Sequence, residues 1–139
     1  MILAIIEHDR GIISPYSLQL LTYAHELAKG DSTNVKAVVI GNNVQVLTSE
    51  LRKYSSDGII IIEDEHFENF SAEAWAGSII QLAEAKEPTI IMAAATDKGN
   101  EVLAHIGAQL DIPMSTYTSA IQETESKKKI TRLRWGSSL

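Results

Sequence analysis

The chain contains no cysteine. That absence excludes disulfides, thiolate metal ligands and a cysteine nucleophile. The amino terminus lacks the basic segment, apolar stretch and small-residue cleavage site of a secretory signal. No apolar run approaches the ~20 residues that a membrane-spanning helix requires. The sequence therefore predicts a cytoplasmic protein that has no membrane partner.

Sequence motifs for catalysis are also absent. The chain has no G-x-S-x-G nucleophile elbow, no P-loop and no G-x-G-x-x-G dinucleotide motif. Its four histidines, His8, His25, His66 and His105, include no i, i+4 pair that could bind a metal ion from one helix. Acidic residues flank His8 and His66, but clustering of this kind does not make a site. We therefore predict no catalytic residues, no metal site and no enzymatic activity.

Basic residues are scarce in most of the chain and concentrated near its end. Five of the twelve Lys and Arg residues lie beyond position 126, at Lys127, Lys128, Lys129, Arg132 and Arg134. All eighteen acidic residues precede them, so residues 1–126 are strongly acidic although the whole chain carries a formal charge of only −6. An acidic body repels a phosphate backbone, and we expect no nucleic-acid partner. The exposed lysines instead discourage edge-to-edge pairing of strands.

Short apolar runs rich in Ile and Val indicate the strands of a sheet. They lack polar alternation, which is typical of parallel strands that are covered on both faces. Such runs occur at residues 2–6, 35–40, 58–62 and 89–93. We therefore predict a parallel sheet built from these runs.

Amphipathic segments with helical spacing separate the apolar runs. These segments are residues 20–28, 44–51, 75–83 and 102–110. Ser14 before Pro15 suits an N-cap and a first helical position, and Ser71 suits the N-cap of the third helix. Asp97 is the predicted cap of the fourth helix. Four helices can therefore cover the sheet.

The pattern changes after Pro113. Residues 115–121 and 130–135 alternate apolar and polar residues more regularly, and the charged stretch QETESKKK separates them. That arrangement indicates a hairpin at one edge of the sheet. The sequence thus predicts a single α/β domain over residues 1–139, with a three-layer open sheet, mostly parallel, and a C-terminal edge hairpin.

Polar residues follow the first predicted strand at the point where the chain must turn. Glu7, His8 and Asp9 come directly after the apolar run. In an open parallel sheet, the ligand crevice lies beyond the carboxyl ends of the strands where the chain order reverses. If the strand order is 3-2-1-4-5, the stretch AAATDKGN brings further residues to the same rim, namely Thr96, Asp97, Gly99 and Asn100. A helix that starts near Lys98 would offer N–H groups to a phosphate or a carboxylate there.

These residues form a candidate nucleotide site, but a simpler interpretation competes with it. Neither loop has a Gly-rich phosphate cradle. Glu7, Asp9 and Asp97 would oppose a negative ligand, and only Arg10 and Lys98 would offset them. Helix capping and turn formation explain the same polar residues without any ligand, and we favour that interpretation.

The chain also resembles a known family. Its start, ILAIIEHDRGIISPYSLQLLTYAHELA, is similar to the N-terminal domain of the electron transfer flavoprotein alpha subunit, in which an apolar strand leads through a Glu-His loop to Ser-Pro and a helix rich in Leu. VKAVVIGNNV and LRKYSSDGIIII resemble its second and third strand regions. IIMAAATDKGNEVLAHIGAQLDIPMSTYTSAI resembles its fourth strand, helix and fifth strand, and TRLRWGSSL the segment that crosses into the flavin domain.

The resemblance implies a fold and a cofactor arrangement. The fold would be that of the adenine nucleotide alpha-hydrolase-like superfamily, with strand order 3-2-1-4-5. In the family this domain is chiefly a scaffold that packs against the beta subunit, while a separate C-terminal domain holds FAD. The sequence stops at Leu139, where that flavin domain would begin. We therefore expect no cofactor on the isolated chain, and FAD or AMP only with a partner.

The expected role is scaffolding or subunit assembly in flavin-linked electron transfer. We expect a homo-oligomer or a flavoprotein subunit partner that meets the chain through the C-terminal hairpin, where Tyr117, Leu133 and Trp135 lie near the basic residues. The alternative is an adenine-nucleotide-binding module of the universal-stress type, which would bind AMP or ATP at the rim formed by residues 7–11 and 95–100. A nucleotide-dependent hydrolase or transferase would need a base, a metal or a nucleophile that the sequence does not offer.

Overall fold

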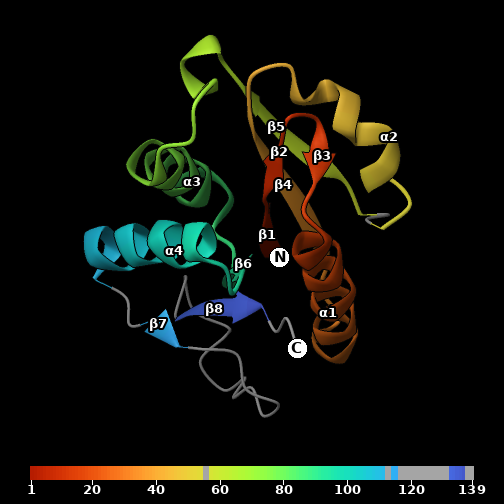
Figure 1. Cartoon of the computed structure of the whole chain (residues 1–139). Helices are drawn as coiled ribbons and strands as arrows, with labels where there is room; N and C mark the ends of the chain where they lie inside the picture. Colours follow the sequence, from red (N-terminus) through yellow and green to blue (C-terminus); the bar gives the residue numbers. More distant parts are fainter. Residues whose placement is uncertain (55–56, 112–113, 116–131, 137–139) are drawn as a thin grey trace.

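A parallel sheet forms the middle layer of the molecule, and helices cover both of its faces (Figure 1). The computed structural model describes residues 1–54, 57–111, 114–115 and 132–136. The sheet has the order β5-β4-β1-β6-β8-β7. Its strands are β5 (Ile59–Glu63), β4 (Val35–Gly41), β1 (Ile2–Ile6), β6 (Ile90–Ala94), β8 (Arg132–Gly136) and β7 (Met114–Ser115). A separate two-stranded pair, β2 (His8–Asp9) and β3 (Ile12–Ile13), follows β1.

The predicted α/β fold with a parallel sheet is confirmed, and so is the order of the first four predicted strands. β1 lies inside the sheet, where Ile2 is in register with Val35 of β4 and with Ile90 of β6. Every residue of β1 and of β6 is buried. Because helices cover both faces, such strands need no polar side, which explains the unbroken apolar runs.

The helices lie in pairs on the two faces of the sheet. The helical elements are α1 (Pro15–Asp31), η1 (Val44–Leu47), α2 (Thr48–Leu51), η2 (Glu65–Phe67), α3 (Ala72–Lys86) and α4 (Asp97–Leu110). Apolar side chains of α1 and α2 share one core with the sheet, and those of α3 and α4 share the other. The helix predicted for residues 44–51 is instead the 3-10 turn η1 followed directly by α2. None of the described helices has the length and the apolar character to cross a membrane.

Caps fix where the long helices begin. The Ser14 hydroxyl accepts a hydrogen bond from the Tyr16 N–H at 3.2 Å, and the Ser71 hydroxyl accepts one from the Ala74 N–H at 3.3 Å, so both predicted caps are confirmed. The predicted cap of α4 is wrong by one position. Thr96 is the N-cap, with the extended backbone (φ −104°, ψ 169°) that a cap requires, whereas Asp97 already belongs to the helix.

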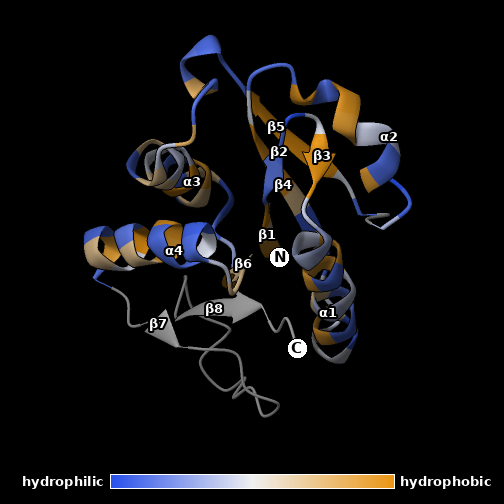
Figure 2. Ribbon diagram, in the orientation of Figure 1, coloured by the Kyte–Doolittle hydropathy of each residue, from blue (hydrophilic) through white to orange (hydrophobic). Residues whose placement is uncertain are grey.

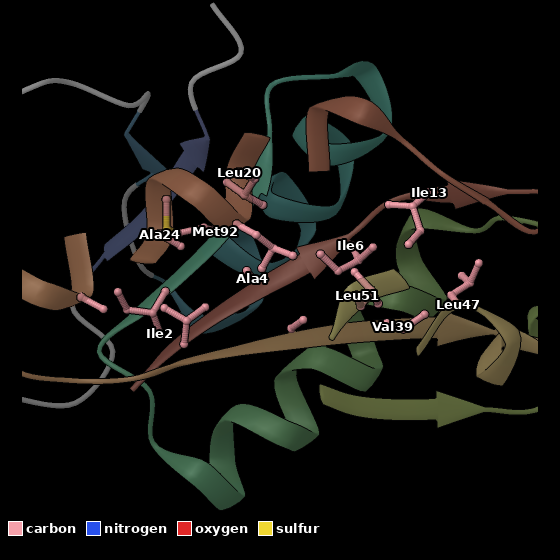
Figure 3. Close-up of a cluster of buried hydrophobic side chains, with 14 of the residues drawn as sticks. Ile2, Ala4, Ile6, Ile13, Leu20, Ala24, Val39, Leu47, Leu51 and Met92 are labelled. Atoms are coloured by element: carbon pink, nitrogen blue, oxygen red, sulfur yellow. The ribbon is translucent and has the colours of Figure 1, made fainter. Parts of the chain in front are cut away.

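Two apolar cores lie between the sheet and the helices. Side chains alternate along β1, so Ile2, Ala4 and Ile6 enter one core and Leu3 and Ile5 enter the other. Figure 3 shows the first of these cores, in which side chains of β1, β4, α1 and α2 meet. In Figure 2 the hydrophobic colour runs along β1 and β5 and forms stripes on the helices. The central strand is therefore packed from both sides.

β5 departs from the prediction that the apolar runs are covered on both faces. Ile59, Ile60, Ile61 and Ile62 are only half-buried, and Glu63 is exposed. The reason is the place of the strand at the edge of the sheet, where β4 is its one partner among the described strands. An apolar run of this kind therefore identified a strand correctly but did not reveal that it lies at an edge.

The C-terminal strands lie beside β6, at the edge where we expected them, but they do not form a hairpin. β8 pairs with β6 and β7 pairs with β8, both in parallel, with Met114 in register with Leu133. A hairpin reverses the chain direction, whereas parallel pairing needs a return segment of about a dozen residues or more. Residues 116–131 are long enough for that return. Most of the predicted hairpin falls on these residues, which lie outside the described part of the chain.

Candidate functional site

A short hairpin follows β1 at the carboxyl end of the sheet. β2 and β3 pair antiparallel, and His8 is in register with Ile13. The two residues of the turn, Arg10 and Gly11, have φ of 54° and 77°. Positive φ at both central residues matches the twist of a two-residue hairpin. The Ser14 N–H donates to the Glu7 carbonyl oxygen at 2.9 Å, so the predicted loop is an ordered element that leads into α1.

Glu7 joins the carboxyl ends of β1 and β6. Its backbone N–H donates to the Ser17 hydroxyl at 2.8 Å, and Ser17 is fully buried in α1. Its carboxylate accepts a hydrogen bond from the Thr96 hydroxyl, with 2.5 Å between Oε1 and Oγ1. These strands flank the point where the chain order of the sheet reverses. The Glu7–Thr96 hydrogen bond therefore bridges the crevice in which the sequence predicts a ligand.

The start of α4 is packed tightly against the end of β6. The Thr96 hydroxyl also accepts a hydrogen bond from the Gly99 N–H at 3.0 Å. A β-carbon on Gly99 would lie 2.1 Å from the Ala94 carbonyl oxygen, which is far inside van der Waals contact. Glycine is therefore required at this position for the helix to approach the strand.

These contacts leave little room for an anion at the α4 N-terminus. The pocket there measures about 10 Å³ and is lined by Glu7, Trp75, Lys98 and Gly99, among others. A volume of that size holds one water molecule at most. The Glu7 carboxylate already supplies the negative charge that a helix N-terminus favours. A phosphate would have to displace this carboxylate from its bond to Thr96.

His8 turns away from β6 and toward β4. One ring nitrogen, Nε2, lies 2.7 Å from the Ile40 carbonyl oxygen, so it carries the proton and donates. The ring stacks on Trp75, with 5.8 Å between the ring centroids and 29° between the planes. A β-carbon on Gly41 would lie 2.9 Å from the His8 Cε1 atom. The absence of a side chain at Gly41 therefore allows the His8 ring to lie over the end of β4.

A larger cleft opens on this side, and we call it the His8 cleft. Its volume is about 540 Å³, within the range of small-molecule sites. The residues that line it come from the β2–β3 turn, the segment that follows β4, η1, the stretch from η2 to α3, α3 itself and the start of α4. They are His8, Asp9, Arg10, Gly11, Asn42, Asn43, Val44, Leu47, Phe67, Glu68, Asn69, Phe70, Trp75 and Lys98.

Aromatic rings form one wall of the His8 cleft. Phe70 meets Trp75 edge to face at 5.1 Å between centroids, and the Lys98 Nζ lies 5.1 Å from the centre of the Phe70 ring. Two acids, Asp9 and Glu68, and two bases, Arg10 and Lys98, share the lining. Such mixed charge gives the cleft no clear preference for an anion, while the rings offer a surface for a planar group.

The structure places five of the seven predicted site residues at the crevice or the cleft. Glu7, Thr96 and Gly99 come together at the bridged crevice, whereas His8 and Asp9 line the His8 cleft. Asp97 is exposed in the first turn of α4, outside both. The Asn100 N–H donates to the Thr96 carbonyl oxygen at 2.8 Å, and its buried side-chain Oδ1 has no hydrogen-bond partner among the described residues.

Sequence reasoning missed the aromatic wall. Trp75 was assigned to a helix core, where it does lie, with 5% of its surface exposed. Its contact with His8 joins residues far apart in the chain, and no sequence spacing reports such a contact. The pair Asn42 and Asn43 directly after the second strand is a signal that could have found the cleft, because it marks a second polar loop at the same end of the sheet.

The acidic cluster around His66 has a local explanation. Asp64 caps η2, accepting from the His66 N–H at 2.9 Å and contacting the His66 Nδ1 at 2.5 Å. The backbone hydrogen bond from His66, followed by its side chain, holds the pKa of Asp64 below its usual value. Within the described part of the chain, no three His, Asp or Glu side chains are placed to hold a metal ion together.

Comparison with known proteins identifies relatives for most of the chain. Residues 2–138 match the family described as "Electron transfer flavoprotein domain". The chain is 29% identical over 104 residues to the electron transfer flavoprotein subunit alpha of Thermoanaerobacterium thermosaccharolyticum, which covers 75% of this chain and 32% of the relative. With the subunit of the same name from Syntrophomonas wolfei it shares 25% identity over 127 residues, or 91% of this chain and 39% of the relative.

A third relative carries a different name. The chain is 27% identical over 104 residues to the "Lactate dehydrogenase (NAD(+),ferredoxin) subunit LctC" of Acetobacterium woodii, covering 75% of this chain and 25% of that protein. The chain thus spans between a quarter and two fifths of the length of these relatives. It matches a part of each that is the size of one domain.

Proposed function

This chain belongs to the electron transfer flavoprotein domain family, and from that premise we propose that it is a scaffold or subunit-assembly domain in flavin-linked electron transfer. The observation that carries the proposal is the Glu7–Thr96 hydrogen bond across the crevice of the sheet. A domain that binds its own nucleotide in this fold needs that crevice open. Here it is bridged and holds about 10 Å³.

The residues of the crevice do not fit FAD. A pyrophosphate needs several N–H donors and a surrounding free of carboxylates. At the start of α4 the Gly99 N–H is already bonded to Thr96, and the Glu7 carboxylate lies beside it. We therefore propose that the chemistry in which this chain takes part is carried by a flavin held on another domain or subunit, and that the chain itself has no catalytic residues.

We propose that the partner is a flavoprotein subunit that meets the edge formed by β8 and β7. Two of the relatives are by name alpha subunits, so they work with at least one other chain. The segment that leads into β8 and β8 itself carry five of the twelve basic residues, at the end of an otherwise acidic chain. Such a segment favours an acidic partner surface and steers its approach.

Flavin retention tests the proposal. The isolated chain should leave a gel-filtration column without flavin, as judged by the flavin absorbance bands and by mass spectrometry. Mixed with an electron transfer flavoprotein subunit of the beta type, it should co-elute with that subunit. Stoichiometric flavin on the isolated chain would overturn the scaffold role, and failure to co-elute would overturn the partner.

A charge variant locates the docking edge. Replacing Lys127, Lys128 and Lys129 by Glu should weaken co-elution, most strongly at low salt, because the screening length grows as salt is removed. The matched control replaces Lys29, Lys53 and Lys86, which are exposed elsewhere in the described part of the chain, by Glu. Equal weakening by both sets would mean that net charge alone acts, and the edge would then lose its support.

The His8 cleft supports a second, narrower proposal. We propose that a nucleotide such as AMP, where the assembled protein holds one on this chain, binds in the His8 cleft, beside His8 and Asp9. The alternative position is the rim formed by Thr96, Asp97, Gly99 and Asn100. The support is the volume of about 540 Å³ and its aromatic wall. Calorimetry with AMP should respond to Trp75→Leu and not to Asp97→Ala. A response to Asp97→Ala alone would return the site to the rim.

A further inference from the structure

β5 leaves one side of its backbone without a partner among the described strands. The Gly58 carbonyl oxygen accepts from the Ala37 N–H, and the Asp64 N–H donates to the Gly41 carbonyl oxygen, each at 3.2 Å. Even-numbered positions of the strand therefore face β4. Because backbone groups alternate in direction along a strand, Ile59, Ile61 and Glu63 present their N–H and C=O groups outward.

The side chains of β5 are also only partly covered. Ile59 and Ile61 pack against the first core, and Ile60 and Ile62 pack against the second, yet all four stay half-buried. Both helical layers thus stop short of the edge. Natural edge strands are blunted by Lys, Pro or a bulge. Residues 58–62 contain no charged residue and no proline.

We propose that β5 pairs antiparallel with β5 of a second copy of this chain, around a twofold axis at Ile61. Only outward-facing residues can exchange hydrogen bonds, so odd positions must lie opposite odd positions. With the axis at Ile61, Ile61 faces its own copy and Ile59 faces Glu63. Each such pair exchanges both N–H···O bonds of an antiparallel ladder.

Other symmetric registers are less favourable. An axis at Ile60 would place Asp57 opposite Glu63 at both ends of the ladder, and an axis at Ile62 would place Ile59 opposite Glu65. An axis at Glu63 would place two carboxylates opposite each other, which destabilises a strand pair. An axis at Ile59 would bring Asp57 opposite Ile61 and leave Glu63 beyond the ladder. The register at Ile61 uses all three outward residues. It also places Ile60 opposite Ile62 on the other face, so that both apolar cores continue from one copy into the next.

The second copy is favoured over an unrelated strand because this edge complements itself. A twofold contact requires that one surface fit itself, and the sequence of four isoleucines before Glu63 meets that condition in the register at Ile61. The opposing effect is charge, since each copy carries −6 and Asp57 would face Glu65 at the two ends of the ladder. Pairing should therefore strengthen when salt is added.

Engineered cysteines test the register, since the natural chain has none. Ile61→Cys should form a covalent dimer under mild oxidation, because Cα atoms of a hydrogen-bonded pair lie about 5.5 Å apart, within disulfide range. Ile59→Cys is the matched control, on the same face and equally half-buried. In this register position 59 lies opposite position 63 of the second copy. The two positions 59 are therefore four residues apart along the ladder, which is too far for a disulfide. The double variant Ile59→Cys with Glu63→Cys should cross-link again.

Light scattering after gel filtration completes the test, at about 1 to 100 μM, where weak association becomes visible. We expect a dimer whose share rises with concentration and with salt, and which Ile61→Lys converts to monomer while the circular dichroism spectrum is kept. A monomer throughout without cross-linking at position 61 would overturn the proposal. So would equal cross-linking at positions 59 and 61, or a dimer that survives Ile61→Lys. None of these outcomes depends on the partner at the β8 and β7 edge.

Discussion

Two glycines at the carboxyl end of the sheet have no room for a side chain. A β-carbon on Gly41 would lie 2.5 Å from the Val44 Cγ1 atom, and one on Gly99 would lie 2.1 Å from the Ala94 carbonyl oxygen. Neither glycine has a positive φ, so close approach rather than backbone freedom explains them. Gly41 admits the His8 ring, and Gly99 brings α4 to the Glu7–Thr96 hydrogen bond. The position of the His8 ring and the Glu7–Thr96 hydrogen bond therefore each depend on a glycine where a β-carbon would clash.

Gly99→Ala should lower stability by about 1 to 3 kcal/mol, the usual cost of overpacking a tight contact. The Ala94 carbonyl oxygen is backbone and cannot move aside as a side chain could. Gly77→Ala is the matched control, because Gly77 lies within α3 with nothing within 4 Å of its missing β-carbon. There alanine should raise stability by about 0.5 to 1 kcal/mol through its better helix propensity. Urea titrations of both variants measure the two signs. Equal effects would show that the contact with Ala94 is unimportant.

His66 should control the ionisation of Asp64. The pKa of Asp64 is lowered first by the backbone hydrogen bond from His66 and next by the His66 side chain. His66→Ala removes only the second, so the pKa of Asp64 should rise part of the way to its ordinary value. A lowered folded-state pKa means that ionised Asp64 contributes stability above the ordinary carboxyl range, and that this contribution is lost as pH falls through the folded pKa.

Carboxyl NMR titration measures this shift directly. His105→Ala, which changes an exposed histidine on α4, should leave the Asp64 titration unchanged. If His66→Ala also leaves it unchanged, the backbone bond alone lowers the pKa.

At the scale of the elements, strand position decides how well a segment could be predicted. β1, β4 and β6 are flanked by strands and covered by helices, so their apolar runs identify them plainly. The pairing of the C-terminal strands could not be predicted in this way. An alternating pattern predicts a strand, but it does not distinguish parallel from antiparallel pairing. The boundary of α4 was missed by one residue since Thr96 and Asp97 are both good capping types, and only the backbone distinguishes them.

β8 should be necessary for stability because it covers the edge of β6. It pairs with β6 from Ile90–Arg132 through Ala94–Gly136. Removing residues 132–139 would expose the backbone of β6, and we expect the melting temperature to fall by more than about 5 °C, since 1 kcal/mol corresponds to about 4 °C at this size. Removing only residues 137–139 keeps β8 and serves as the control. An unchanged melting temperature after the longer truncation would mean that β8 contributes little to the fold and acts only at an interface.

At the scale of the whole molecule, the sheet order could be predicted but the use of its carboxyl end could not. The order follows from the alternation of strands and helices together with the family resemblance. Which side of β1 is open depends on single contacts, Glu7 with Thr96 on one side and His8 with Trp75 on the other. Each of these joins residues more than sixty positions apart, and such contacts carry no local pattern. The seven predicted site residues follow the carboxyl ends of β1 and β6, but the sequence offers no way to separate the bridged crevice from the His8 cleft.

The inner position of β1 also has a consequence for how the chain folds. Ile2 pairs with Ile90, so β1 needs one neighbour that is made 88 positions later. At about 5 to 20 residues per second, this strand waits roughly 5 to 20 seconds during synthesis for that neighbour. Contacts of such high sequence separation also make refolding slow, because the closing of a long loop precedes any gain from it. Until then one edge of β1 has no partner strand, and we expect a chaperone that binds short apolar segments to recognise the nascent chain.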